Sequence, residues 1–132
     1  MTTFVDTSGI HAVFDRDDTN HQRAGEAWRR LLADHAPLLT TNYVLLETSA
    51  LLQRRLGMAD LQAFHDDVVP LLRIEWIEEA RHQAAVEAVL AAGKRKLSVV
   101  DCVSFQVMRQ LGVHTVFCFD QHFREQGFEV IP

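Results

Sequence analysis

Residues 4–9 read Phe-Val-Asp-Thr-Ser-Gly (FVDTSG), so an apolar pair runs directly into a carboxylate, two small hydroxyl side chains and a glycine. An apolar run that stops at such residues is typical of a strand that ends in a turn. Asp6 then has two possible roles. It caps the short helix predicted over residues 8–14 by accepting backbone N–H groups, or it belongs to a functional site. For Asp6 alone, the cap is the commoner role.

Short apolar runs alternate with longer stretches of helical period along the rest of the chain. Strands are predicted at residues 4–7, 37–41, 73–77, 115–119 and 128–131. Helices are predicted at residues 8–14, 21–35, 42–56, 59–69, 78–92 and 98–111, the fourth of them stopped by Pro70. Parallel strands need crossover connections, so this α/β order predicts a mostly parallel sheet of about five strands covered by helices on both sides.

Length and composition bound the class of protein. The chain has 132 residues, which predicts a single domain over residues 1–132. A hydrophobic fraction of 48% and a charged fraction of 23% argue against disorder, collagen and a membrane protein. No apolar run approaches the roughly 20 residues of a membrane-spanning helix, so we expect no membrane partner and a cytoplasmic location. Cys102 and Cys118 lie in apolar segments, which predicts buried, reduced thiols.

The distribution of charge bears on nucleic-acid binding. The net charge of −5 is unfavourable for a partner made of phosphates, which are contacted by Lys and Arg. Basic residues nevertheless cluster at residues 29–30, 54–55 and 93–96, and the local potential matters more for steering than the total charge. For each cluster taken alone, a solvated surface is the simpler explanation.

Three further acids, like Asp6, have both a structural and a functional explanation. Glu47 lies a little over one turn inside the third predicted helix, among apolar neighbours, where an exposed helical Glu is the structural alternative. Asp101 follows Ser98 by three residues, as in a capping box, but opens the most apolar helix of the chain. Asp120 ends the fourth predicted strand, where it could cap a turn.

Taken together, the four acids predict a metal site. Ligands of open parallel sheets bind beyond the carboxyl ends of the strands, so all four side chains can point into one crevice. Four carboxylates there would raise one another's pKa unless a cation joined them. Oxygen ligands select a hard ion such as Mg²⁺ or Mn²⁺. Such an ion suits phosphodiester hydrolysis, because it activates a water and holds the scissile phosphate.

The ordered set of motifs resembles a PIN domain, and specifically the VapC family of ribonuclease toxins. The motifs are FVDTSG (4–9), TTNYVLLETSALL (40–52), LSVVDCVSF (97–105) and FCFDQHF (117–123). No single motif is specific, but their order and separations are, and the resemblance covers nearly the whole chain. It implies a three-layer α/β/α sandwich and a metal-dependent endoribonuclease, the toxin of a toxin–antitoxin system.

The resemblance also implies roles for residues and partners. Asp6 and Asp101 match the positions of direct metal contact, whereas Glu47 and Asp120 would act through water or a second metal. Thr7 and Ser98 match small hydroxyl residues near the site, although helix-entry roles explain them equally well. The family binds RNA and commonly forms homodimers that a cognate antitoxin neutralises. Residues 42–72 would make such contacts, unless their apolar side chains belong to the core.

Other classes of site find less support in the sequence. The seven histidines are scattered without zinc spacing and are interpreted as structural; His122, two residues after Asp120, is interpreted as a turn residue. No GxSxG, GxxxxGKS or GxGxxG motif is present. Two alternatives stay open: a phosphoacceptor receiver-like module, disfavoured by the single acid after the first strand, and an inactive PIN-like interaction domain, disfavoured by the presence of all four acids.

Overall fold

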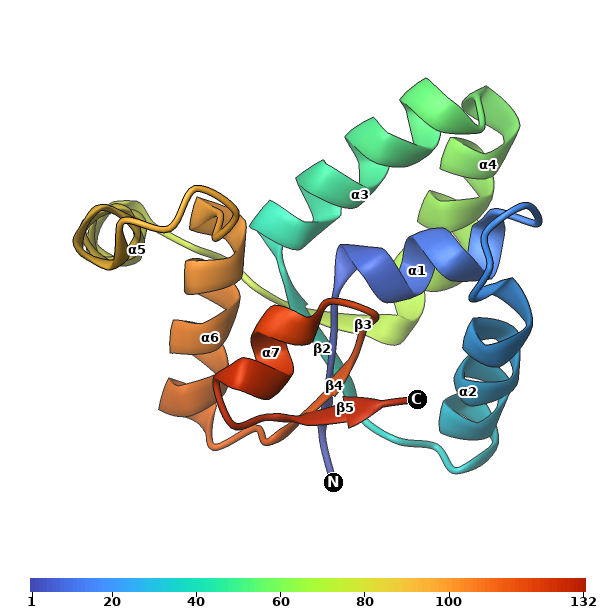
Figure 1. Cartoon of the computed structure of the whole chain (residues 1–132). Helices are drawn as coiled ribbons and strands as arrows, with labels where there is room; N and C mark the ends of the chain where they lie inside the picture. The colour runs from blue at the N-terminus through green and yellow to red at the C-terminus, as the bar shows by residue number, and fades with distance from the viewer.

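The computed structural model describes residues 1–132 and has a five-stranded, all-parallel sheet with the strand order β3-β2-β1-β4-β5 (Figure 1). The strands are β1 (Thr3–Val5), β2 (Leu38–Thr41), β3 (Leu72–Glu75), β4 (Thr115–Phe117) and β5 (Glu129–Ile131). The α-helices are α1 (Thr7–Phe14), α2 (His21–Ala33), α3 (Asn42–Arg55), α4 (Met58–Ala63), α5 (Glu79–Ala92), α6 (Val99–Leu111) and α7 (Gln121–Glu125).

The sheet is buried on both faces, because successive strand residues point to opposite sides. Phe4 and Val116 join one core with α5, α6 and α7, whereas Val5 and Phe117 join a second core with α1, α2 and the segment after α4. Helix α3 crosses above the sheet and contributes to both cores (Figure 1). The predicted three-layer α/β/α sandwich is therefore confirmed.

The opening motif packs α1 tightly against the central strands. A Cβ atom at Gly9 would lie 2.7 Å from the ring of Phe117 and 2.8 Å from its carbonyl oxygen, so only glycine fits there. The Thr40 hydroxyl donates to the carbonyl of Val5 over 2.8 Å and ties the end of β1 to β2. These contacts bring the turn after β1 to the middle of the sheet edge.

The predicted strands all exist, but three of them end two residues earlier than predicted. Strand β1 stops at Val5 instead of residue 7, because Asp6 is the N-cap of α1 and Thr7 is its first residue. Strand β4 stops at Phe117 instead of residue 119, because the N–H of Phe119 donates to Ser8 Oγ over 2.9 Å. Strand β3 stops at Glu75 instead of residue 77, because the N–H of Ile77 donates to Asn42 Oδ1 over 2.7 Å. Side chains of neighbouring segments thus take backbone donors that a longer strand would use.

Two helical predictions were wrong. The helix predicted over residues 59–69 is α4, followed by a π-helical turn (Phe64–Val68) and a 3₁₀ turn (Val69–Leu71), and Pro70 lies inside the last turn instead of ending an α-helix. Helix α7 was not predicted; the segment after Asp120 was expected to be a turn. The buried ring of Phe123 anchors this five-residue helix in the core.

Both cysteines are free and buried, as predicted. Burial raises the pKa of the Cys118 thiol to about 12, which leaves it protonated and unreactive. No helix of the structure combines the length and the apolar character needed to cross a membrane.

Candidate active site

A cavity of about 630 Å³ lies at the carboxyl edge of the sheet, lined by residues of α1, of α3, of the start of α6 and of the segment after β4. From β1 the chain first builds the sheet toward β3 and later adds β4 and β5 on the other side. The point between β1 and β4 is therefore the switch point at which parallel sheets bind ligands. Asp6, Glu47, Asp101 and Asp120 all line this cavity, so the structure brings the four acids together as expected.

Asp6 lies deepest in the cavity and combines both roles considered for it. It is 4% exposed, and its Oδ2 accepts the N–H of Ser8 over 3.1 Å and the Ser8 hydroxyl over 2.7 Å as the N-cap of α1. The pKa of Asp6 is raised to about 7, mainly by burial and to a smaller extent by the charges of Asp101 and Glu47, against the opposing hydrogen bonds from Ser8. Because both hydrogen bonds from Ser8 go to Oδ2, the other carboxylate oxygen of Asp6, Oδ1, is available to a ligand.

Asp101 forms a capping box with Ser98 at the start of α6. The Asp101 N–H donates to Ser98 Oγ over 3.0 Å, and the Ser98 N–H donates to Asp101 Oδ2 over 3.2 Å. Burial raises the pKa of Asp101, and the charge of Asp120 adds to the effect. The capping box explains the Ser98–Asp101 spacing, and the carboxylate still faces the cavity.

Asp120 lies three residues beyond the end of β4 and caps α7. Its Oδ1 accepts the N–H of His122 over 2.9 Å. The ring Nδ1 of His122 lies 3.1 Å from Asp120 Oδ1 and 3.7 Å from Asp101 Oδ2, and it is buried without a hydrogen-bond partner. His122 was interpreted as a turn residue, but the structure puts its ring between two of the acids.

Two other predicted site residues, Glu47 and Thr7, also line the cavity. Glu47 is exposed on α3, where it forms one wall of the cavity. Thr7 also lines the cavity, but its hydroxyl is hydrogen-bonded to the buried Thr48 hydroxyl over 2.9 Å. That bond joins α1 to α3, so Thr7 contributes to the architecture of the site.

The acidic site has the character of a cation site. One ligand atom from each of Asp101, Asp120 and His122 lies within 4.8 Å of the others. The four predicted site residues all offer carboxylate oxygens, which suit a hard divalent ion, and His122 adds one imidazole nitrogen. A bound cation would also reverse the electrostatic cost that raises the pKa of Asp6, because it favours the ionised carboxylates. The residues present therefore fit a divalent metal.

Two residues of the site escaped the sequence prediction. Ser8 connects both sides of the switch point, since its hydroxyl donates to Asp6 and accepts from the N–H of Phe119. His122 joins two acids that lie 19 residues apart in the chain (Asp101 and Asp120). The spacing of His122 from Asp120 was the only signal for it in the sequence, and a five-residue helix was needed to turn the ring inward.

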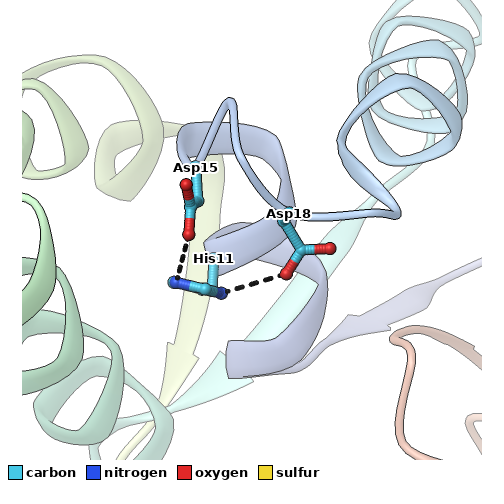
Figure 2. Close-up of side chains that lie close together, drawn as sticks. All are labelled: His11, Asp15 and Asp18. Carbon is cyan, nitrogen blue, oxygen red and sulfur yellow. Dashed lines mark ion pairs between the residues drawn. The ribbon is translucent and has the colours of Figure 1, made fainter.

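A second group of ionisable side chains, His11, Asp15 and Asp18, lies at the loop after α1 (Figure 2), and His11 and Asp18 line the cavity. The His11 ring lies between two carboxylates, with Nε2 3.3 Å from Asp15 Oδ2 and Nδ1 3.6 Å from Asp18 Oδ2. The remaining oxygen of each carboxylate accepts a backbone N–H, from Asp17 and Asn20 respectively. The group thus holds the loop of residues 15–20 against α1. Sequence spacing gave no indication of it, because His11 was interpreted as one of several scattered histidines.

The chain is similar to known proteins over nearly its whole length. The family model of the PIN domain matches residues 3–129. The chain is 36% identical over 132 residues to the 23S rRNA-specific endonuclease VapC20 from two strains of Mycobacterium tuberculosis, with 98% of each protein covered. The crystal structure of M. tuberculosis VapC20, a sarcin–ricin loop cleaving toxin, matches with a TM-score of 0.84 and 35% identity over 100% of both chains.

A more distant structure shares the fold alone. FitAcB from Neisseria gonorrhoeae matches with a TM-score of 0.70 at 16% identity, covering 100% of this chain and 97% of the other. The motifs, the all-parallel sheet and the family match over residues 3–129 lead to the same assignment. The chain belongs to the PIN domain family.

Proposed function

We propose that this protein is a Mg²⁺- or Mn²⁺-dependent endoribonuclease that acts as the toxin of a toxin–antitoxin pair. The observation that carries the proposal is the meeting of four acids from separate segments in one cavity, in a chain with a full-length relative named as an RNA endonuclease. Membership of the PIN family removes the receiver-like module from consideration. An inactive PIN-like interaction domain remains the competing hypothesis.

The proposed roles follow from depth in the cavity. Asp6 and Asp101, both buried and both held by helix-capping bonds, would contact the metal directly. Glu47 and Asp120, which are more exposed, would act through water or through a second ion. A divalent ion held there supplies activation of the attacking water and neutralisation of charge on the phosphate. His122 would orient the carboxylates of Asp101 and Asp120, to which its Nδ1 lies closest.

The proposed substrate is large-subunit ribosomal RNA, by analogy with the substrate named for VapC20. Identity of 36% over the whole length supports a shared substrate class. The action on ribosomes would place the protein in the cytoplasm.

The proposed protein partners are a cognate antitoxin and a second copy of the chain. The segment expected to make these contacts, residues 42–72, carries exposed apolar side chains at Leu46, Met58 and Leu71, with 73%, 65% and 49% exposure. Large apolar side chains that stay exposed in this way are available for a protein interface.

A cleavage assay with Asp101→Asn tests the proposed function. Wild-type protein should cleave a large-subunit rRNA fragment with Mg²⁺ or Mn²⁺ and not with EDTA, and Asp101→Asn should lower the rate by about 10³-fold or more, comparable to removing a key electrostatic group. An Asn side chain can still accept the Ser98 N–H, so the helix cap and the fold should survive.

Asp67→Asn is the matched control, because Asp67 is exposed and lies outside the cavity. It should cleave at the wild-type rate. Equal rates for wild type and Asp101→Asn would overturn the site assignment, and a complete lack of cleavage by wild type with all rRNA fragments would favour the inactive interaction domain.

A further inference from the structure

Two cations stand at the rim of the acidic cavity without a carboxylate partner. Arg54 and Lys96 are the only Arg and Lys side chains that line it, and both are exposed. The ion pairs made by Arg side chains in the structure involve Arg73 and Arg81. The charges of Arg54 and Lys96 therefore remain free, although four acids lie in the same cavity.

The two cations reach the cavity from different segments, Arg54 from the last turn of α3 and Lys96 from the loop before α6. Helix α3 presents Glu47, Ala50, Leu51 and Arg54 to the cavity, which is the i, i+3, i+4, i+7 face of one helix. Arg54 is thus two turns, about 10.5 Å, beyond Glu47 along the helix axis. Lys96 precedes Ser98 in the loop that leads into α6, and this loop lies by the other end of α3 (Figure 1).

An acidic cavity creates an electrostatic problem for a polyanion. The net charge of the chain is −5, and the four carboxylates lie where a phosphodiester would bind. A metal ion would compensate the scissile phosphate alone. Phosphates on either side would meet an unfavourable potential unless separate cations contacted them.

We propose that Arg54 and Lys96 form a two-sided phosphate clamp, in which each binds an RNA phosphate that flanks the scissile one. The RNA strand then runs along the cavity face of α3, from the α5–α6 loop toward the last turn of α3. The clamp rests on the proposed ribonuclease function and assigns the path of its substrate. Arg54 and Lys96 are positioning residues, since they hold the strand across the acids and touch no reacting atom.

The chain offers matched controls for both cations. Arg55 and Lys94 are exposed, carry the same charges and lie one and two residues away, but neither lines the cavity. Arg54→Ala and Arg55→Ala change the net charge equally, as do Lys96→Ala and Lys94→Ala. A difference within either pair therefore reports position and not total charge.

The binding test uses the cleavage-deficient Asp101→Asn protein and a fluorescent rRNA hairpin, titrated at several KCl concentrations. Arg54→Ala and Lys96→Ala should each weaken binding about fivefold, and each should reduce the slope of log K against log[salt] by about 0.7, the value for one lost contact to a single strand. Arg54→Lys should restore most of the slope. Arg55→Ala and Lys94→Ala should leave the slope unchanged.

The same variants in the cleaving protein separate this inference from the proposed function. Arg54→Ala and Lys96→Ala should raise KM with little change in kcat, as expected for lost binding away from the reacting atoms. If wild type cleaves and the variants in each pair behave alike, the clamp is wrong while the ribonuclease stands. If wild type does not cleave but the pairs still differ in RNA binding, the proposed function is wrong while the clamp stands.

Discussion

Two groups of acids border the same cavity and differ in how their charge is compensated. In the loop after α1, His11 lies between Asp15 and Asp18 (Figure 2), and a protonated imidazole there pairs with both carboxylates. At the sheet edge, Asp6 receives only the neutral donors of Ser8, and the nearby acids raise its pKa instead of lowering it.

Both groups have a geometry that could hold a cation, and they differ in how many of their acids lie next to an imidazole. The His11 group has an imidazole next to both of its carboxylates, and each carboxylate is anchored to the loop by a backbone N–H. The four-acid group has one imidazole, His122, near two of its members and none against Asp6. A cluster of acids left without enough positive charge is stabilised by binding protons or an external cation, and the cation is the form of compensation that keeps the carboxylates ionised.

The largest expected effect concerns the pH dependence of stability in the metal-free protein. The pKa of Asp6 is about 7 when folded and near 3.8 when unfolded, so the folded state binds the proton more tightly between these values. The free energy of unfolding should therefore fall as pH rises from about 4 to about 7 and level off above. Between pH 5 and 7 the loss is on the order of 2 kcal/mol.

Urea denaturation in EDTA measures this effect, with Asp6→Asn as the control that removes the titrating group. The wild-type minus Asp6→Asn difference should slope downward with pH, and added Mg²⁺ should stabilise wild type more at pH 8 than at pH 5. If the free energy of unfolding depends on pH in the same way in both proteins, ionising Asp6 costs no stability and the prediction is wrong.

The second prediction concerns Glu47, the exposed acid in the wall of the cavity, in contrast to the buried Asp6. Glu47→Gln should lower the rate of RNA cleavage roughly 10–100-fold, the usual loss for a group acting on a metal through an outer shell. Because Glu47 is exposed, the free energy of unfolding should change by no more than about 0.5 kcal/mol. Glu87→Gln, an exposed Glu on α5, is the matched control and should behave as wild type in both assays. Unchanged cleavage by Glu47→Gln would remove Glu47 from the site.

The smallest expected effect tests the compensated group. Asp15→Asn removes one partner of His11 and should cost no more than about 1 kcal/mol of stability, as for a partly exposed ion pair. Asp15 does not line the cavity, so the increase in Tm caused by Mg²⁺ should equal that of wild type. Loss of the Mg²⁺ effect in Asp15→Asn would mean that the two groups of acids are not independent.

The sequence predicted most of the architecture because local patterns carry it. Five strands and six of the α-helical segments follow from apolar period and from caps such as Ser98 and Thr41. The places where prediction failed depend on contacts between distant segments. Phe119 leaves the strand because Ser8 accepts its N–H, and α7 forms around Phe123, which reaches the core only once the sheet is assembled.

For the candidate site, the sequence by itself determined which residue types are present and that Asp6, Asp101 and Asp120 stand at strand ends or helix starts. Helix caps are local, so their spacing is visible in the chain. Only the tertiary structure decided which charges are compensated, since the distance of His122 from Asp101, of His11 from Asp18, and of Arg54 from any acid is set by packing. Electrostatic compensation depends on separation in space and on burial, which residue spacing does not encode.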